Sequence, residues 1–196
     1  MKDNELKNED MKRLITIVLV ALLALPAFSQ ELSKQEQKQL EKQLKKEQKA
    51  EEMAQTAKVV TAMVEYQRFV LEAYSLKDKR GNTVNVSSNI NFVAADSLQG
   101  VIQVGSNTYI GRNGVGGTTV EGEISNYKYT LHEKSGSYNM TYVLSTPVGT
   151  YDVRLTVYPD SRASADVSST TWGGRLTYSG YLVPVGASRV YKGMSL

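Results

Sequence analysis

Alternation of apolar and polar positions is the main signal in the C-terminal part of the chain, and it predicts short β-strands. In residues 151–157 the odd positions are apolar and the even positions are polar, which is the pattern of a strand with one buried face. Residues 127–133 and 138–145 predict a hairpin, because the short Gly-containing loop 134–137 joins them. By the same reasoning we expect strands at residues 68–76, 91–95, 97–104, 118–125, 163–168 and 175–183, with residues 189–192 as a candidate edge strand.

Short strands at steady spacing, joined by tight turns, predict an antiparallel meander for residues 66–196. Such a sheet has to close into a barrel or fold into a sandwich to hide its edges. We therefore expect a mainly β fold with a barrel-like or strongly curved sheet, and a β-sandwich is the alternative. An outer-membrane barrel is disfavoured, because it needs outward apolar faces along strands of about 9 to 11 residues.

Before the strands, residues 31–58 are dense in Glu, Gln and Lys and contain no Gly, Pro or aromatic residue. These strong helix formers predict one long charged N-terminal helix within residues 30–65, and Ser33 and Glu36 fit a capping box at its start. An apolar stripe predicts that the end of the helix docks on the β domain. A spacer helix is favoured over a partner-binding arm, since no heptad pattern is sustained. The stripe consists of Met53, Ala57, Val60 and Val64.

The N-terminal pattern is that of an export signal. Lys12 and Arg13 precede an uncharged apolar run over residues 14–25, and Pro26 ends this run before the small-residue motif at residues 27–29. The run is about 12 residues long, well below the roughly 20 needed to cross a bilayer as a helix, although an uncleaved anchor or a buried helix is an alternative. We expect residues 1–29 to be an N-terminal extension and cleavable signal peptide that begins naturally at Met11. The mature chain would then start at Gln30, periplasmic or secreted and without a stable membrane anchor.

Composition narrows the choice of partners. The chain contains no cysteine, so neither disulfides nor a lipidated N-terminal cysteine are available, and stability has to come from an ordinary hydrophobic core. Its 23 basic and 20 acidic residues nearly balance, which argues against a nucleic-acid binder. We expect the partner to be a small ligand, a glycan or an envelope protein.

The sequence offers little that resembles a catalytic or metal site. His132 is the single histidine, so a Ser-His-Asp triad could form only around it, and metal sites usually gather several His, Cys and carboxylate ligands. Glu121 and Glu123 lie two residues apart on one strand face, a pair that could perform glycoside hydrolysis. A solvent-facing polar strand face is the simpler interpretation, and we expect no catalytic residue, no cofactor and no metal.

The Gly-rich run at residues 111–117 is the most unusual segment. A strand rather than a helix follows it, so it lacks the helix N-terminus of a phosphate-binding loop, and we interpret it as a long turn beside a binding site. Trp172, which precedes two glycines, could plug a barrel end or stack on a ligand. The candidate ligand-binding residues are Arg112, Asn113, Gly114, Gly116, Gly117 and Trp172.

Several separated motifs support a family resemblance. They are Phe69-Val70-Leu71-Glu72-Ala73, Asn91-Phe92-Val93, Asn113-Gly114-Val115-Gly116-Gly117, Glu121-Gly122, Tyr151-Asp152-Val153, Gly180-Tyr181-Leu182-Val183-Pro184 and Val190-Tyr191-Lys192-Gly193. Over residues 55–196 the chain resembles an uncharacterised family of exported proteins from Gram-negative gut bacteria, domain of unknown function 4251. The resemblance implies a periplasmic or envelope location and brings no activity or site residues.

These observations favour a non-catalytic exported envelope protein that binds a ligand or partner through its β domain. One alternative is a glycan-acting hydrolase that uses a carboxylate pair. The other is a structural or chaperone-like envelope protein that engages partners through the charged helix.

Overall fold

The computed structural model describes residues 34–106, 114–171 and 173–196, so the predicted signal peptide and Ser33 lie outside the described part of the chain. A compact unit comprises residues 47–196, and residues 34–46 form the start of a helix that continues into it. The elements are α2 (Lys34–Glu65), β1 (Arg68–Asp78), β2 (Thr83–Asn85), β3 (Phe92–Asp96), β4 (Gln99–Val104), β5 (Thr118–His132), β6 (Ser137–Thr146), β7 (Gly149–Val157), β8 (Arg162–Ser169), β9 (Arg175–Val183) and the 3-10 helix η1 (Val185–Ala187).

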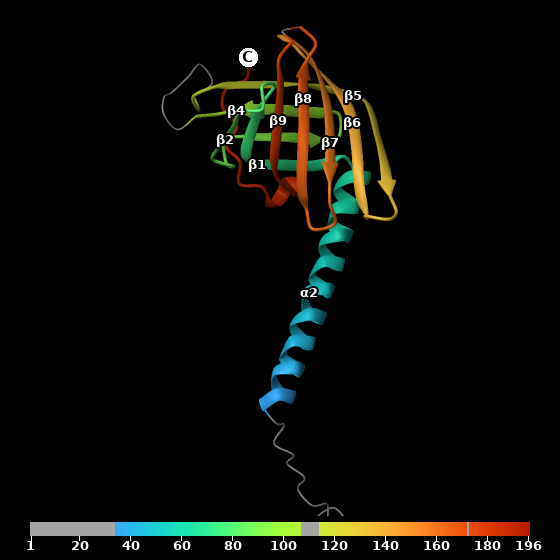
Figure 1. The fold of residues 1–196 in the computed structure, drawn as a ribbon. Helices are drawn as coiled ribbons and strands as arrows, with labels where there is room; N and C mark the ends of the chain where they lie inside the picture. The colour runs from blue at the N-terminus through green and yellow to red at the C-terminus, as the bar shows by residue number, and fades with distance from the viewer. Residues whose placement is uncertain (1–33, 107–113, 172) are drawn as a thin grey trace, which may run out of the picture. The chain divides into compact units, whose positions relative to one another are not determined.

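The strands form a closed antiparallel barrel. Each of β3 to β8 pairs with the next strand along the chain, and β1 closes the ring by pairing with β3 on one side and β9 on the other. The short strand β2 pairs with the far end of β1. Figure 1 shows β6–β9 crossing β1 and β4 at a steep angle, so the predicted barrel is confirmed and the sandwich alternative is not formed.

Two kinds of irregularity allow the sheet to curve. A bulge interrupts the pairing of β1 with β9 between Ala73 and Ser75. Opposite it, a Cβ at Gly180 would collide with the carbonyl oxygen of Glu72, and a Cβ at Gly122 would collide with that of Ser145. Glycine is therefore required at both places, where neighbouring backbones approach closely at a corner of the barrel.

The strand predictions need three corrections. Residues 118–132 form one strand rather than two, interrupted by a bulge at Asn126, whose φ is 55°. The short strand β2 was not expected. Residues 189–192 do not form an edge strand. They belong to the C-terminal segment, the stretch of chain after η1, which lies against the outside of the barrel and is held mostly by side chains.

The end of α2 docks on the barrel, with its contact face shifted from the predicted stripe. Val60 and Val64 are buried as expected, but Met53 is 45% exposed, and Met63 is buried in its place. The reason is the 3.6-residue helical period, which puts residues 60, 63 and 64 on one side of the last turns. The hydroxyl of Tyr127 donates to the carbonyl oxygen of Val64 at 2.8 Å, so β5 fixes the docked end.

Among the described residues, no helix combines the length and the apolar composition that a bilayer crossing requires.

Candidate functional site

A cavity of about 250 Å³ opens at the end of the barrel opposite to the docked helix. Its walls are the inward-facing residues near the end of β4, the start of β5, the start of β7, the end of β8 and the start of β9. An eight-stranded barrel is just wide enough to be filled by side chains or to hold one small ligand. In this barrel, side chains fill the interior at the end next to α2, and the cavity lies at the opposite end. The aliphatic part of the wall consists of Ile102, Val104, Val120, Val167 and Leu176.

Polar groups are few in this wall. Tyr151 and Tyr178 line the cavity, and Arg175 lies at its rim. Arg175 donates to the carboxylate of Asp166 at 2.8 Å, and the hydroxyl of Thr177 donates to the same carboxylate. Partial burial raises the pKa of Asp166, but the hydrogen bonds from Thr177 and Arg175 lower this pKa by a larger amount. The pKa of Asp166 is therefore below its ordinary value. The guanidinium at the rim is therefore already paired with an ionised carboxylate.

A row of tyrosines follows the barrel interior. The ring of Tyr127, beside the docked helix, lies 6.2 Å from the ring of Tyr142, and Tyr142 and Tyr178 both belong to the buried core. Burial, reinforced by the neighbouring tyrosines, raises the pKa values of Tyr142 and Tyr178 well above the ordinary value. Both side chains are thus neutral hydroxyls at any physiological pH.

Tyr142 stands out because its hydroxyl is buried without a hydrogen-bond partner among the described residues. The side chain is 3% exposed. Tyr127 differs, since its hydroxyl reaches both the Val64 carbonyl and the Met140 sulfur. Buried hydroxyls are usually paired, so this unpaired hydroxyl is expected to cost stability, and Tyr142 is not among the residues that line the cavity.

Some described neighbours of the two segments that the sequence analysis singled out line this cavity. Val104 and Thr118, which flank the Gly-rich segment, line it, and so do Ser169 and Gly174, which flank Trp172. Arg112, Asn113 and Trp172 themselves lie outside the described residues. Of the described glycines, Gly114 and Gly116 have φ values of +77° and +75°, as expected for a turn that needs glycine. A Cβ at Gly117 would collide with the carbonyl oxygen of Val104. None of these three glycines is among the residues that line the cavity.

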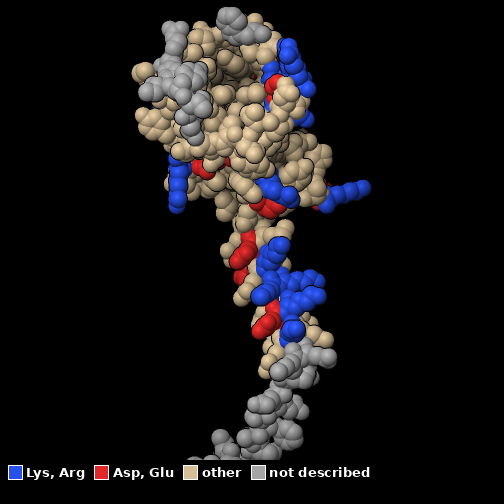
Figure 2. Space-filling model, turned by 60° about the vertical axis from the view of Figure 1, so that its left-hand side comes forward, with Lys and Arg blue, Asp and Glu red and all other residues tan. Residues whose placement is uncertain are grey.

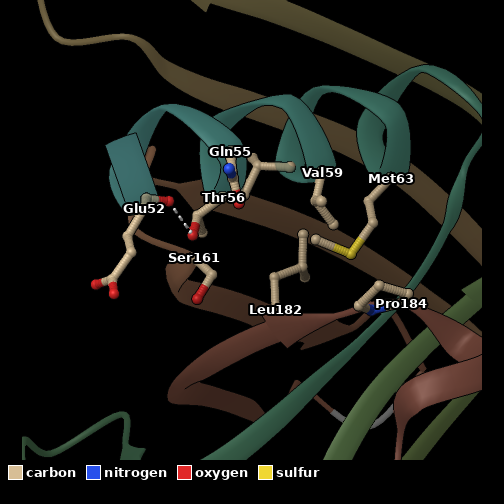
Figure 3. A pocket seen from close by; sticks show the side chains of 9 residues that line it. Glu52, Gln55, Thr56, Val59, Met63, Ser161, Leu182 and Pro184 are labelled. Carbon is tan, nitrogen blue, oxygen red and sulfur yellow. Dashed lines mark hydrogen bonds between the residues drawn. The ribbon is translucent and has the colours of Figure 1, made fainter. Parts of the chain in front are cut away.

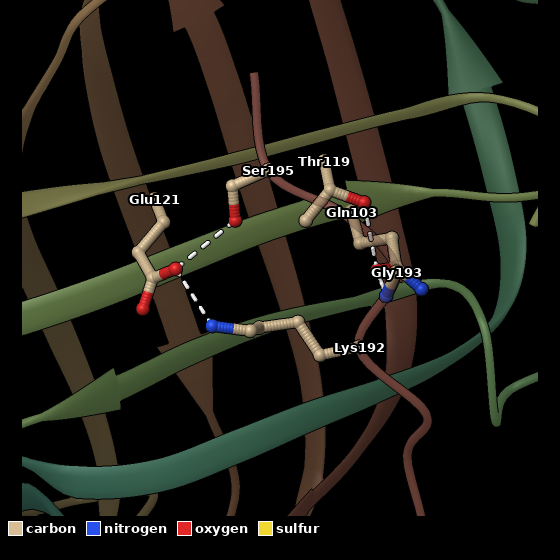
Figure 4. A network of polar contacts seen from close by, with 6 residues as sticks. All are labelled: Gln103, Thr119, Glu121, Lys192, Gly193 and Ser195. Carbon is tan, nitrogen blue, oxygen red and sulfur yellow. Dashed lines mark hydrogen bonds and ion pairs between the residues drawn. The ribbon is translucent and has the colours of Figure 1, made fainter. Parts of the chain in front are cut away.

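The carboxylate pair considered for hydrolysis lies on the outside of the barrel. Glu121 accepts from the Lys192 ammonium at 2.6 Å and from the Ser195 hydroxyl at 3.0 Å (Figure 4). The Lys192 hydrogen bond lowers the pKa of Glu121. Glu123 is exposed, and neither carboxylate lines the barrel cavity. The structure thus gives Glu121 a role in holding the C-terminal segment.

Similarity to known proteins is consistent with the fold. A family model described as a domain of unknown function, DUF4251, matches residues 47–182. The chain belongs to the DUF4251 family. A solved relative, the crystal structure of a DUF4251 family protein from Bacteroides eggerthii DSM 20697, is 32% identical with a TM-score of 0.59. The similarity covers 69% of this chain and 91% of that one. Comparison with curated proteins gives no match.

One buried amide helps to attach the C-terminal segment of this DUF4251 protein to the barrel, together with the carboxylates of Glu72 and Glu121. The side chain of Gln103 is 0% exposed. Its nitrogen donates to the carbonyl oxygens of Ile90 and Tyr191 at 3.0 and 2.9 Å. Its oxygen accepts from the Thr119 hydroxyl and the Gly193 amide at 2.8 and 2.9 Å. All four hydrogen-bonding positions of the amide are used, which joins β4, β5 and the segment, as Figure 4 shows in part.

A second hollow of the DUF4251 domain lies between α2 and the strand ends beside it. It measures about 500 Å³ and has an apolar floor and a polar rim that includes Glu52, Gln55 and Ser161. Figure 3 shows Val59 and Met63 of α2 facing Leu182 and Pro184. Thr56 donates to the carbonyl oxygen of Glu52 within the helix, so this hydroxyl already has a partner inside the protein.

Other polar candidates also have internal partners. His132 is exposed and lies 2.8 Å from the side-chain nitrogen of Asn139, its neighbour on β6. Within the described ranges, no group of three or more His, Cys, Asp or Glu side chains could hold a metal ion.

Sequence reasoning missed the residues that actually line the cavity. The sequence placed Val120, Val167 and Tyr178 only within predicted strands, since period-two alternation marks a buried face without telling a filled interior from a hollow one. The small residues of these strands held no signal of the cavity, because Ala73, Ala163 and Ala165 are buried in the core and do not line it.

Proposed function

We propose that this DUF4251 protein is an exported, non-catalytic binding protein that takes a small ligand into the open end of its β-barrel. The observation that carries the proposal is the 250 Å³ cavity with its aliphatic wall and few polar groups. Concave, mostly apolar sites with a small number of placed polar groups are the usual form of small-molecule sites. The hollow beside α2 is the weaker candidate, because its lining includes freely exposed helix positions such as Val59.

Binding is favoured over hydrolysis by the state of the acidic groups. Glycoside hydrolysis needs two carboxylates facing one substrate. Glu121 is engaged by Lys192 and Ser195, and Asp166 is engaged by Arg175 and Thr177. Charge on the face shown in Figure 2 is divided into small groups of both signs, which suits a neutral partner better than a polyanion.

The ligand-binding proposal is tested with naphthalene and 2-naphthol as probes, measured by equilibrium dialysis. The wild-type protein is expected to bind at least one of them with a dissociation constant below about 1 mM. Val167→Trp, which places an indole in the cavity, is expected to abolish that binding, and Leu176→Trp serves as a second filling variant closer to the mouth. Val143→Trp on the outer face of β6 is the matched control and should bind as the wild type does. Absence of binding by the wild type would overturn the proposal.

Export is the second part of the proposal, supported by the apolar run at residues 14–25 and the cleavage motif at residues 27–29. It is tested by intact-mass measurement of the protein recovered from the envelope fraction of an expressing Gram-negative host. We expect a mature chain that begins at Gln30. A chain that retains residues 11–29 would contradict cleavage.

A further inference from the structure

We infer that the barrel cavity holds only the apolar end of an amphipathic ligand, and that the polar head of this ligand stays at the cavity mouth, beside Tyr151. The inference rests on the proposed function, because it assumes that the cavity is the binding site. It adds the class of the ligand, a molecule with one small apolar group and one hydrophilic head, and the direction in which that ligand enters.

Polar lining residues gather at the mouth of the cavity, where the strands of its wall begin or end. Tyr151 and Ser169 lie opposite each other on β7 and β8, and Thr118 and Arg175 are the first residues of β5 and β9. All four line the cavity. Thr118 and Arg175 are exposed, and Tyr151 and Ser169 are half-buried. A polar group of a ligand placed here can therefore form hydrogen bonds and still contact water.

The wall becomes aliphatic one step further into the barrel. Val167 and Leu176 pair across β8 and β9, and Ile102 and Val120 pair across β4 and β5. Of these four, the two valines and the isoleucine are at most 6% exposed. Among the described lining residues below this layer, Tyr178 alone has a polar side chain. A polar head that passed this layer would lose its water for at most one hydroxyl partner, which is unfavourable.

The cavity volume of about 250 Å³ limits how much of a ligand can enter. An engineered apolar cavity of about 150 Å³ in another protein binds benzene, and pockets for drug-sized molecules begin at about 300 Å³. The barrel cavity lies between these values, so it suits one or two fused rings or a short alkyl chain. A head as large as a sugar does not fit beside such a group and has to remain outside.

A probe with a large head tests the direction of entry. In 2-naphthyl β-D-glucopyranoside the oxygen of 2-naphthol carries a sugar. The wild-type protein is expected to bind this glucoside and 2-naphthol with dissociation constants within about 3-fold of each other, measured by equilibrium dialysis, because the sugar stays in water. Val167→Trp should abolish the binding of both probes, with Leu176→Trp as the second filling variant, and circular dichroism establishes that each is folded. Binding of 2-naphthol without binding of the glucoside would overturn the inference.

Two tyrosines at different depths of the same cavity give an independent test. Tyr151→Phe removes a hydroxyl at the mouth and should weaken 2-naphthol binding by about 3-fold, the factor of a modest net hydrogen bond, with naphthalene binding unchanged. Tyr178→Phe is the matched variant in the interior and should leave the binding of both probes at the wild-type value. Weaker 2-naphthol binding in Tyr178→Phe, or an unchanged affinity in Tyr151→Phe, would contradict a polar head at the mouth.

These outcomes separate the inference from the proposed function. If 2-naphthol binds but the glucoside does not, or if the two tyrosine variants behave in the opposite way, the ligand enters differently and the cavity remains a binding site. If naphthalene, 2-naphthol and the glucoside all fail to bind the wild-type protein, the proposed function itself fails.

Discussion

Two buried polar side chains of this protein, Gln103 on the outside of the barrel and Tyr142 on the inside, have opposite environments. Gln103 uses every donor and acceptor of its amide to join β4, β5 and the C-terminal segment. Tyr142 lies in an apolar interior, and its hydroxyl is bonded to none of the described residues. Both side chains are almost completely removed from solvent.

The difference separates a stabilising polar group from a destabilising one. A buried polar group whose bonds are all made within the protein fixes one arrangement of the chain, and removing it leaves its partners unpaired. A buried group with an unmade bond costs stability instead, because it has lost water without gaining a partner. Mutation should therefore lower stability at Gln103 and raise it at Tyr142.

The largest expected effect belongs to Gln103→Leu. The variant leaves the carbonyl oxygens of Ile90 and Tyr191, the Thr119 hydroxyl and the Gly193 amide without their partner. We expect the free energy of unfolding to fall by about 3 kcal/mol, measured by urea denaturation. Gln99→Leu, at an exposed position of the same strand, should change it by less than about 0.5 kcal/mol. Equal losses in the two variants would contradict the structural role of Gln103.

Alkaline pH should reveal the buried tyrosines. Burial raises the pKa values of Tyr142 and Tyr178 above the unfolded value of 10.0. Above pH 10 the unfolded chain loses the two tyrosine protons while the folded protein keeps them, so the free energy of unfolding falls as pH rises. Below pH 10 both states keep the protons, and the two tyrosines cause no pH dependence. Each tyrosine contributes a slope of about 1.4 kcal/mol per pH unit. Urea denaturation at a series of pH values above 10 should show a shallower slope for Tyr142→Phe, and the Tyr142→Phe, Tyr178→Phe double variant should lose both contributions.

At neutral pH we expect substitution by Phe at two tyrosines to change the free energy of unfolding in opposite directions. Tyr142→Phe removes an unpaired buried hydroxyl and should raise the unfolding free energy by about 1 kcal/mol. Tyr127→Phe removes a hydroxyl that donates to the Val64 carbonyl at 2.8 Å and should lower it by about 1 kcal/mol. Thermal unfolding of both variants at pH 7 measures the difference. Destabilisation by Tyr142→Phe would show that its hydroxyl has a partner after all.

Much of the fold could be predicted from the sequence because strand periodicity and turn residues are local signals. Residues 151–157 and the 134–137 turn illustrate this, since both were placed from a few neighbouring residues and match β7 and the β5–β6 hairpin. The edge strand at residues 189–192 was wrong for a non-local reason. Tyr191 is 65% exposed, and Gln103 and Glu121 hold this stretch through their side chains rather than by strand pairing.

The site was harder to predict than the fold. The glycines at 114 and 116 mark a turn through their conformational needs, and the sequence could indicate that turn but not that its glycines lie outside the cavity lining. The pairing of Gln103 depends on residues far apart in the chain, such as Gly193. Composition and spacing carry no information on those distances.

The smallest expected effect concerns Glu121, which belongs to the same attachment as Gln103 but is partly open to solvent. Its ion pair with Lys192 has side chains 46% and 38% exposed, and such pairs contribute only about 0–1 kcal/mol. We expect Glu121→Gln to lower the unfolding free energy by less than about 0.5 kcal/mol at low salt, and by less still at high salt, where the pair is screened. Denaturation of both proteins at two salt concentrations measures this.

The lowered pKa of Glu121 fixes the direction of the pH dependence. The small stabilisation by Glu121 is present above the pKa of this group in the unfolded chain, and it is lost as pH falls through the pKa in the folded protein. A loss as large as that of Gln103→Leu would mean that the carboxylate, rather than the buried amide, holds the C-terminal segment.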